Sequence, residues 1–122
     1  MATVAVTEQN FAATVKSGIV LLDWWAARCG PCRAFAPTFE RASEAHPDVV
    51  FGKVDTEDQP RLASAFQIRS IPTLMVLRDG ILLYAEPGMV PAAALDELIK
   101  KTRELDMDQV RRELDAAETK SA

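Results

Sequence analysis

Apolar and polar stretches alternate along the 122-residue chain in a pattern that predicts strands and helices in turn. Apolar runs predict strands over residues 3–6, 19–25, 49–54, 73–77 and 81–85. Apolar residues at helical spacing predict helices over about 8–16, 31–46 and 91–101, with a short helix inside 55–67. Thr7 is a candidate cap for the first helix, and Pro37 should kink the second.

The order of these elements indicates how the strands pair. Helices between the early strands imply crossover connections and therefore parallel pairing. Arg78-Asp79-Gly80 lies between the last two strands and is a strong hairpin signal, which implies an antiparallel pair. We therefore predict an α/β fold with a mixed central β-sheet flanked by helices on both faces.

The last residues differ in character from the rest of the chain. Residues 104–122 are dense in charge, and Val110, Leu114 and Ala117 recur at i, i+4 and i+7. This spacing favours an amphipathic helix over 106–118, but a solvated, partly frayed extension agrees with the sequence equally well. We expect one domain over residues 1–103 and a charged C-terminal extension over 104–122.

Net charge and the lengths of the apolar runs limit which kinds of partner the protein can bind. The net charge is −4 and no basic patch stands out, which argues against nucleic acid or an anionic membrane as a partner. The N-terminus lacks a basic region followed by a long apolar stretch, and no apolar run approaches 18 residues. We therefore expect a cytoplasmic, monomeric protein.

Both cysteines lie in Cys29-Gly30-Pro31-Cys32, at the start of the predicted helix over 31–46. Residues three apart in a helix have Cβ atoms about 5–6 Å apart, and a disulfide needs Cα atoms roughly 4.4–6.8 Å apart. The pair can therefore open and close with little backbone movement. The partial positive charge of the helix start would stabilise a thiolate at Cys29, and the thiolate is the nucleophile. Cys32 should be more shielded.

Two other uses of the cysteines carry less weight. A structural disulfide that closes so small a loop would constrain little of the unfolded chain. Zinc normally needs four ligands, whereas this chain has two cysteines and a single histidine, His46, at the far end of the predicted helix. A dimer that shares four cysteines would supply the ligands, but redox chemistry remains the favoured interpretation.

Further motifs accompany the cysteine pair in a specific order. They are Asp23-Trp24-Trp25-Ala26, Pro37, Lys53-Val54-Asp55, Ser70-Ile71-Pro72-Thr73 and Pro87-Gly88. In this combination the chain resembles the thioredoxin family over residues 2–103. The resemblance implies a thioredoxin fold and a protein thiol–disulfide oxidoreductase that reduces substrate disulfides through a mixed-disulfide intermediate.

The resemblance also implies a role for each catalytic residue. Cys29 would attack the substrate disulfide and Cys32 would resolve the mixed disulfide. Asp23 would be a buried carboxylate that accepts the proton of Cys32, and Lys53 would lie near Asp23 and modulate it. Burial on an apolar strand should raise the pKa of Asp23. The alternatives are an Asp23 that reaches solvent at the strand end and a Lys53 that is an ordinary surface lysine.

By the same resemblance, Pro72 would be a cis-proline facing the cysteines, and the Ile71 backbone would pair with a bound substrate segment. The implied docking patch consists of Gly30, Pro31, Ile71, Pro72, Gly88 and Met89. Trp25 would pack beside the active site, although a plain core tryptophan is the alternative. Arg28 stands where the family usually has tryptophan, so a cation replaces an aromatic docking surface and partner preference should change.

The implied partners are disulfide-containing proteins and an NADPH-dependent thioredoxin reductase. The chain shows no nucleotide-binding motif, so we expect no bound cofactor and no metal. Two other functions suit the same fold. One is a disulfide oxidant or isomerase, towards which Arg28 points slightly. The other is a binding module in which the thiols are incidental, against which the retained Cys29, Cys32 and Asp23 argue.

Overall fold

Five strands form one mixed β-sheet in the order β1-β3-β2-β4-β5. The computed structural model describes residues 2–121, with the side chains of 2–118. The strands are β1 (Thr3–Ala5), β2 (Ile19–Trp25), β3 (Val50–Asp55), β4 (Thr73–Arg78) and β5 (Ile81–Pro87). β1, β3 and β2 run parallel, whereas β4 is antiparallel to both β2 and β5. The predicted mixed sheet is confirmed.

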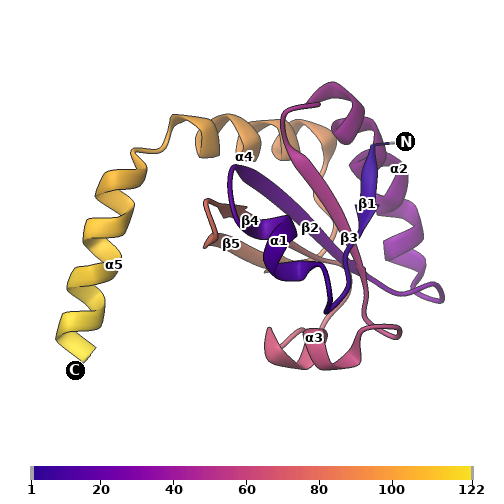
Figure 1. Cartoon of the computed structure of the whole chain (residues 1–122). Helices are drawn as coiled ribbons and strands as arrows, with labels where there is room; N and C mark the ends of the chain where they lie inside the picture. Colours follow the sequence, from indigo (N-terminus) through magenta and orange to yellow (C-terminus); the bar gives the residue numbers. More distant parts are fainter. Residues whose placement is uncertain (1, 122) are drawn as a thin grey trace.

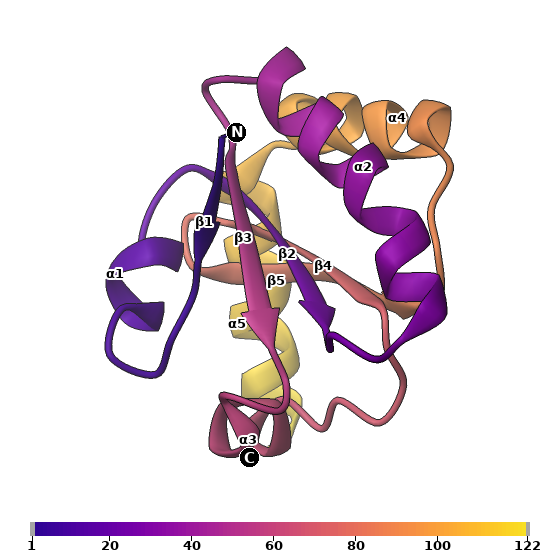
Figure 2. The same cartoon turned by 90° about the vertical axis from the view of Figure 1, so that its right-hand side faces the viewer.

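Helices cover both faces of this sheet (Figure 2). They are α1 (Phe11–Val15), α2 (Gly30–Ala45), α3 (Pro60–Ala65), α4 (Ala92–Glu104) and α5 (Met107–Ser121). One core cluster joins the sheet to α1 and α3 through Val15 and Leu62. The other joins it to α2 and α4 through Phe35, Phe39 and Leu95. The predicted placement of helices on both faces is therefore confirmed.

Strand β2 lies at the centre and contributes to both clusters. Successive side chains of a strand point to opposite faces. Leu22 and Trp24 accordingly belong to the cluster of α1 and α3, and Leu21 belongs to that of α2 and α4. Asp23 shares the face of Leu21 by the same alternation. The sequence thus places one carboxylate on the buried face beneath α2.

Gly52 of β3 allows the side chains around it to approach closely. A Cβ at this position would lie 2.6 Å from Val6 Cγ2 and 2.8 Å from Leu22 Cδ2. Real Cβ atoms do not come so near to other carbons. Because Gly52 has no side chain, the side chains of Val6, which follows β1, and of Leu22 on β2 can pack against the β3 backbone.

The first helix begins later than the sequence pattern predicts. The Thr7 amide donates to Asn10 Oδ1 at 2.8 Å, and the Asn10 amide donates to Thr7 Oγ1 at 3.3 Å. These reciprocal bonds have the pattern of a capping box and close a turn over residues 7–10, and the Phe11 amide donates to the Thr7 carbonyl at 2.9 Å. Asn10, rather than Thr7, is the residue that precedes the helix.

The predicted β4–β5 hairpin is present, and its turn consists of Asp79 and Gly80 alone because Arg78 belongs to β4 and pairs with Ile81. Asp79 and Gly80 have positive φ angles of 53° and 80°. Positive φ at both central residues matches the right-handed twist of the flanking strands, and Asp-Gly is a favoured pair for it. The turn also joins the start of β2, because the Gly18 amide donates to Asp79 Oδ1 at 2.9 Å.

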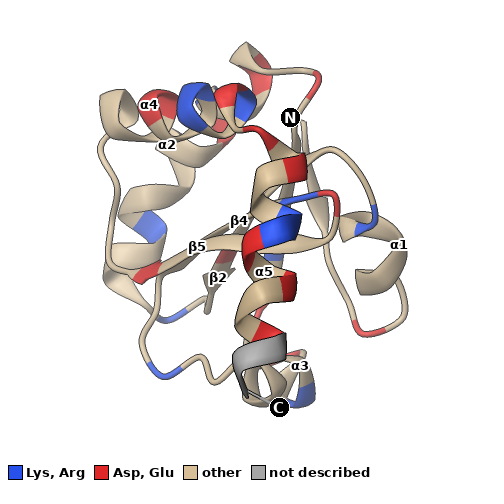
Figure 3. Cartoon of the chain, turned by 90° about the vertical axis from the view of Figure 1, so that its left-hand side faces the viewer, with Lys and Arg blue, Asp and Glu red and all other residues tan. Residues whose placement is uncertain are grey.

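The residues after α4 form the helix α5, so the helical alternative for the extension is right (Figure 1). Arg78 of β4 donates to the carbonyls of Thr102 at 2.8 Å and Leu105 at 3.1 Å, which satisfies the open end of α4. Met107 is buried, and Arg111 pairs with Asp79 of the hairpin at 3.4 Å. The first turns of α5 therefore contact the domain. Beyond a basic stretch at Arg111 and Arg112, the charged residues of α5 whose side chains the structure describes are acidic (Figure 3).

We predict that Met107 anchors α5, whereas Leu114 contributes little to stability. Met107 is 7% exposed and Leu114 is 44% exposed. Met107→Ala should lower the free energy of unfolding by about 1–3 kcal/mol, because it removes buried apolar surface and leaves a cavity. Leu114→Ala, the matched control, should change it by less than about 0.5 kcal/mol. Urea denaturation measures both, and equal losses would contradict the assignment.

Candidate functional site

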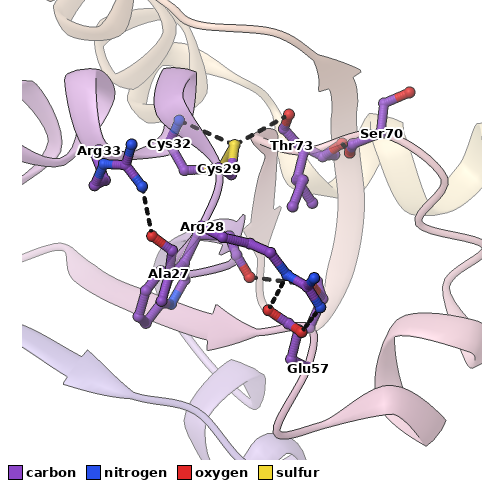
Figure 4. The surroundings of a disulfide bond; sticks show 11 residues. Ala27, Arg28, Cys29, Cys32, Arg33, Glu57, Ser70 and Thr73 are labelled. Carbon is purple, nitrogen blue, oxygen red and sulfur yellow. Dashed lines mark hydrogen bonds and ion pairs between the residues drawn. A yellow bond between two sulfur atoms is a disulfide. The ribbon is translucent and has the colours of Figure 1, made fainter.

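The two cysteines lie at the N-terminus of α2 and are joined by a disulfide (Figure 4). Their Cα atoms are 5.2 Å apart. Cys29 is the N-cap residue, and its sulfur accepts a hydrogen bond from the Cys32 amide at 3.2 Å. The same amide would stabilise negative charge on Cys29 after reduction, since unpaired N–H groups and the helix dipole both favour an anion at this end.

Burial distinguishes the two sulfurs. Cys29 is partly exposed, whereas Cys32, in the first turn of α2, is buried with 2% of its surface exposed. Gly30 and Pro31 between them are exposed. The Cys29 sulfur is therefore the more accessible of the two from solvent.

A second segment lies against the cysteines. The Ile71–Pro72 peptide bond is cis, and the Ile71 carbonyl oxygen lies 3.6 Å from Cys29 Sγ. The Gly88 amide donates to the Pro72 carbonyl at 2.8 Å, which holds the turn after β5 beside this loop. Met89 follows and is 50% exposed. The structure thus brings Cys29, Ile71, Pro72 and the Gly88–Met89 turn together at one end of the sheet.

Asp23 lies on the face of β2 that α2 covers. It is fully buried, and neither of its carboxylate oxygens has a hydrogen-bond partner among the described residues. Burial raises the pKa of the Asp23 carboxyl from 3.8 to about 6, against a smaller lowering by the Lys53 ammonium. The alternative in which Asp23 reaches solvent is wrong. A carboxyl with this pKa can exchange a proton near neutral pH.

Lys53 lies on the strand next to that of Asp23, and Trp25 lies two residues after Asp23 on the same strand. Lys53 of β3 is the register partner of Asp23 in the parallel β2–β3 pair. Its ammonium lies 4.9 Å from the centre of the Trp25 ring, a cation–π contact. Both side chains are half-buried and line an open cleft of about 420 Å³ next to β1. Lys53 is therefore in place to act on the charge of Asp23.

Arg28 extends away from the cysteines and pairs with Glu57 (Figure 4). Its Nε donates to Glu57 Oε1 at 3.2 Å and its Nη2 to Oε2 at 2.5 Å. This bidentate hydrogen bond lowers the pKa of Glu57. The charge of Arg28 is thus shared with a carboxylate rather than directed at Cys29 alone.

Glu57 and Arg33 lie next to the site, but no motif in the sequence identifies either residue. Arg33 Nη1 donates to the Ala27 carbonyl at 2.8 Å and so braces the segment before Cys29. Strand pairing is the signal that finds Glu57. Trp25 pairs with Asp55 in the parallel register, so the segments that continue from β2 and β3 emerge side by side. An acidic residue two positions beyond Asp55 then comes near Arg28.

An accessible sulfur that forms a disulfide with a buried one, at the start of a helix, places the protein among the thiol–disulfide oxidoreductases. The family model described as Thioredoxin matches residues 2–101, and the chain belongs to the thioredoxin family. The resemblance in the sequence motifs is therefore confirmed, and with it the thioredoxin fold.

Named relatives agree with this assignment. The chain is 55% identical over 111 residues to the Streptomyces coelicolor protein named "Putative thioredoxin 2", covering 90% of this chain and 83% of the relative. It is 39% identical over 102 residues to the thioredoxin of Bacillus subtilis, covering 83% of this chain and 98% of the relative.

A solved structure has the same fold. It comes from a study of thiol resolution in yeast mitochondrial 1-Cys peroxiredoxin by the glutathione and thioredoxin systems. The match has a TM-score of 0.74 at 27% identity and covers 82% of this chain and 95% of that chain. Fold and family thus agree.

Membership in this family settles the class of activity. The protein is a thiol–disulfide oxidoreductase of the protein disulfide reductase type, with a Cys29–Cys32 redox pair. Thioredoxins in general act on disulfide substrates and are reduced by thioredoxin reductase. No observation favours the oxidant, isomerase or binding-module alternatives. Within the described residues, 2–121, no helix is both long enough and apolar enough to cross a membrane.

We predict that Asp23→Asn stabilises the protein at pH 7 and that this gain disappears in acid. The pKa of Asp23 is higher in the folded state, about 6, than its ordinary value of 3.8. The folded protein therefore binds the extra proton between these pH values, and stability falls as pH rises through them. Asparagine removes this loss, worth on the order of 1–3 kcal/mol at pH 7.

Urea denaturation of both proteins at pH 7 and at pH 3.5 measures the effect. The two proteins should differ at pH 7 and nearly converge at pH 3.5, where the carboxyl is fully protonated in the folded state and mostly protonated in the unfolded state. An equal difference at both pH values would show that the aspartate does not titrate as a buried group. Asp55→Asn is a matched control on the neighbouring strand, because Asp55 is only half-buried.

Proposed function

We propose that Cys29 is the attacking thiol and Cys32 the resolving thiol in the reduction of protein disulfides. The difference in burial carries this assignment, because a substrate sulfur can reach the partly exposed Cys29 but not Cys32. The Cys32 amide, 3.2 Å from Cys29 Sγ, supports the same direction by favouring the thiolate at Cys29.

The reaction proceeds in two exchanges. The Cys29 thiolate attacks one sulfur of the substrate disulfide, forms a mixed disulfide and releases the other sulfur as a thiolate. Cys32 then loses its proton and attacks Cys29 Sγ, which releases the second substrate thiolate and closes the Cys29–Cys32 disulfide. The substrate gains two electrons, and the protein loses two.

Asp23 is the proposed acceptor of the Cys32 proton. It is buried on the face of β2 beneath α2, and its pKa of about 6 suits proton transfer near neutral pH. Lys53, its register partner, is proposed to favour the charged form of the carboxylate and so to limit the rise of its pKa. Trp25 is proposed to hold the Lys53 ammonium in place.

Substrates are proposed to dock along the Ile71–Pro72 loop as an added extended segment. Pro72 has no backbone N–H that would compete for the segment, and Ile71 offers its backbone next to Cys29. The proposed contact surface also includes Arg28, Gly30, Pro31, Gly88 and Met89. We call this set, together with Ile71 and Pro72, the docking surface.

An NADPH-dependent thioredoxin reductase is proposed to return the disulfide to the dithiol, so that no bound cofactor is needed. We propose a cytoplasmic monomer whose thioredoxin domain spans residues 1–103, with 104–122 as an extension.

We predict opposite defects for the two cysteine variants. Cys29→Ser should abolish disulfide reduction, because no accessible thiol remains. Cys32→Ser should still attack a substrate but should accumulate mixed disulfides when no external thiol is present, because the protein has no second thiol to resolve them. Insulin turbidity with dithiothreitol measures turnover, and non-reducing mass spectrometry of the pre-reduced protein mixed with insulin without dithiothreitol measures the adducts.

The wild-type protein, carried through both measurements, is the control and should turn over without accumulating adducts. If Cys29→Ser formed the adducts and Cys32→Ser were inert, the roles of the two thiols would be reversed. If both single variants turned over insulin at the wild-type rate, the disulfide-reductase proposal itself would fail.

A further inference from the structure

Met89 differs from the other described methionines in its exposure to solvent. Of the four methionines in the chain, Met75 is 2% exposed and Met107 is 7% exposed, whereas Met89 is 50% exposed. Met1, the fourth, lies outside the described residues. An oxidant in water can therefore reach the Met89 thioether, while the core shields the thioethers of Met75 and Met107.

The residues on either side of Met89 keep its side chain at the surface. Gly88 has a φ of 106°, a conformation that favours glycine, and its amide donates to the Pro72 carbonyl at 2.8 Å. Val90 is partly buried and packs against the core cluster of α2 and α4. The backbone is thus fixed both before and after Met89, so its thioether stays accessible beside the Ile71–Pro72 loop.

Met89 supplies the exposed long apolar side chain of the docking surface. Among the other apolar members, Ile71 is half-buried, Pro72 is buried and Pro31 is exposed but has only a short ring. Val50 and Leu82 are also exposed, but they lie near the starts of β3 and β5, at the end of the sheet opposite Cys29. The apolar character of the docking surface therefore depends chiefly on the side chain of Met89.

We propose that Met89 is an oxidation site, at which a peroxide converts the thioether to a sulfoxide and thereby weakens the docking of protein disulfides. With hydrogen peroxide, the Met89 sulfur attacks one peroxide oxygen, an S–O bond forms, the O–O bond breaks and water is released. Met89 loses two electrons, and the peroxide gains two. The sulfoxide oxygen is a polar group that a docked substrate would bury without a hydrogen-bond partner. This inference rests on the proposed reductase function.

The redox state of the cysteines determines when this oxidation occurs. A Cys29 thiolate would itself react with peroxide, whereas two sulfurs joined in a disulfide present no thiolate. While the Cys29–Cys32 disulfide is closed, Met89 is therefore the sulfur of the site that peroxide oxidises. The modification is expected in the oxidised form of the protein, before a reductant returns it to the dithiol.

Peroxide treatment of the full chain in its disulfide form tests the site. Catalase stops the reaction, and mass mapping of peptides follows the addition of one oxygen atom to each methionine. Met89 should be oxidised at least about tenfold faster than Met75 and Met107, because oxidation follows exposure. Oxidation of Met89 no faster than that of Met75 would overturn the site.

Kinetics with two disulfides of different size test the effect on docking. Dithiothreitol reduces the cysteines of treated and untreated protein and leaves the sulfoxide in place. For fluorescein-labelled insulin, treatment should lower kcat/KM at least about threefold, mainly through a higher KM. The rate with dithiobis(nitrobenzoate), a disulfide too small to cover the docking surface, should not change. The two methionine sulfoxide reductases, one for each sulfoxide epimer, should restore the insulin value.

Two leucine variants are matched controls for the thioether. Met89→Leu has an apolar side chain of similar size that peroxide does not oxidise. Its kcat/KM for insulin, whatever its value before treatment, should be the same afterwards. Met107→Leu removes a buried thioether instead, so peroxide should lower its kcat/KM by the same factor as that of the wild type.

The outcomes separate this inference from the reductase function. An equal loss of rate for insulin and for the small disulfide would overturn the docking effect, because the cysteines themselves would then be impaired. A loss that persists in Met89→Leu would also overturn it. Failure of the untreated protein to reduce insulin would overturn the reductase function and the docking effect with it, whereas peptide mapping would still test Met89 as the oxidation site.

Discussion

The burial of strand β2 on both faces is the constraint on which the rest of the structure depends. Leu21, Leu22 and Trp24 all have no exposed surface, so helices must cover both sides of the sheet. The helix that covers the face of Leu21 is α2, and its first turn carries the cysteines. The same alternation that buries Leu21 against Phe35 directs Asp23 to the face beneath that turn. Strand β2 therefore determines both how α2 packs on the sheet and where the buried carboxylate of Asp23 lies.

The active site forms because several chain segments turn at the same end of the sheet. β2 and β3 end there, β4 begins there, and β5 returns there through the Asp79–Gly80 hairpin. Backbone bonds then fix the loops to one another. Thr56 donates to the Trp25 carbonyl at 2.9 Å, and Gly88 donates to the Pro72 carbonyl at 2.8 Å. The sulfur of Cys29 thus lies on a surface of connected loops rather than on a single flexible one.

The sequence predicted the sheet, the hairpin and the position of the cysteines because each depends on a local pattern. The start of α1 was predicted too early: the Thr7 hydroxyl accepts from the Asn10 amide as a cap would, but residues 8–10 form a turn and the helix begins at Phe11. The helical state of the extension and the Arg28–Glu57 pair could not be decided, because both depend on tertiary partners. Burial of Met107 supports the helix, and parallel pairing of β2 with β3 brings Glu57 to Arg28.

The close packing at Gly52 has a consequence for how this sequence can diverge. Val6 Cγ2 and Leu22 Cδ2 fill the space that a side chain at position 52 would need. A larger residue there becomes acceptable only when both neighbours become smaller. Because Gly52 precedes Lys53, any shift of this segment would also move the ammonium that acts on Asp23. Positions 6, 22 and 52 should therefore covary among related sequences, although they are far apart along the chain.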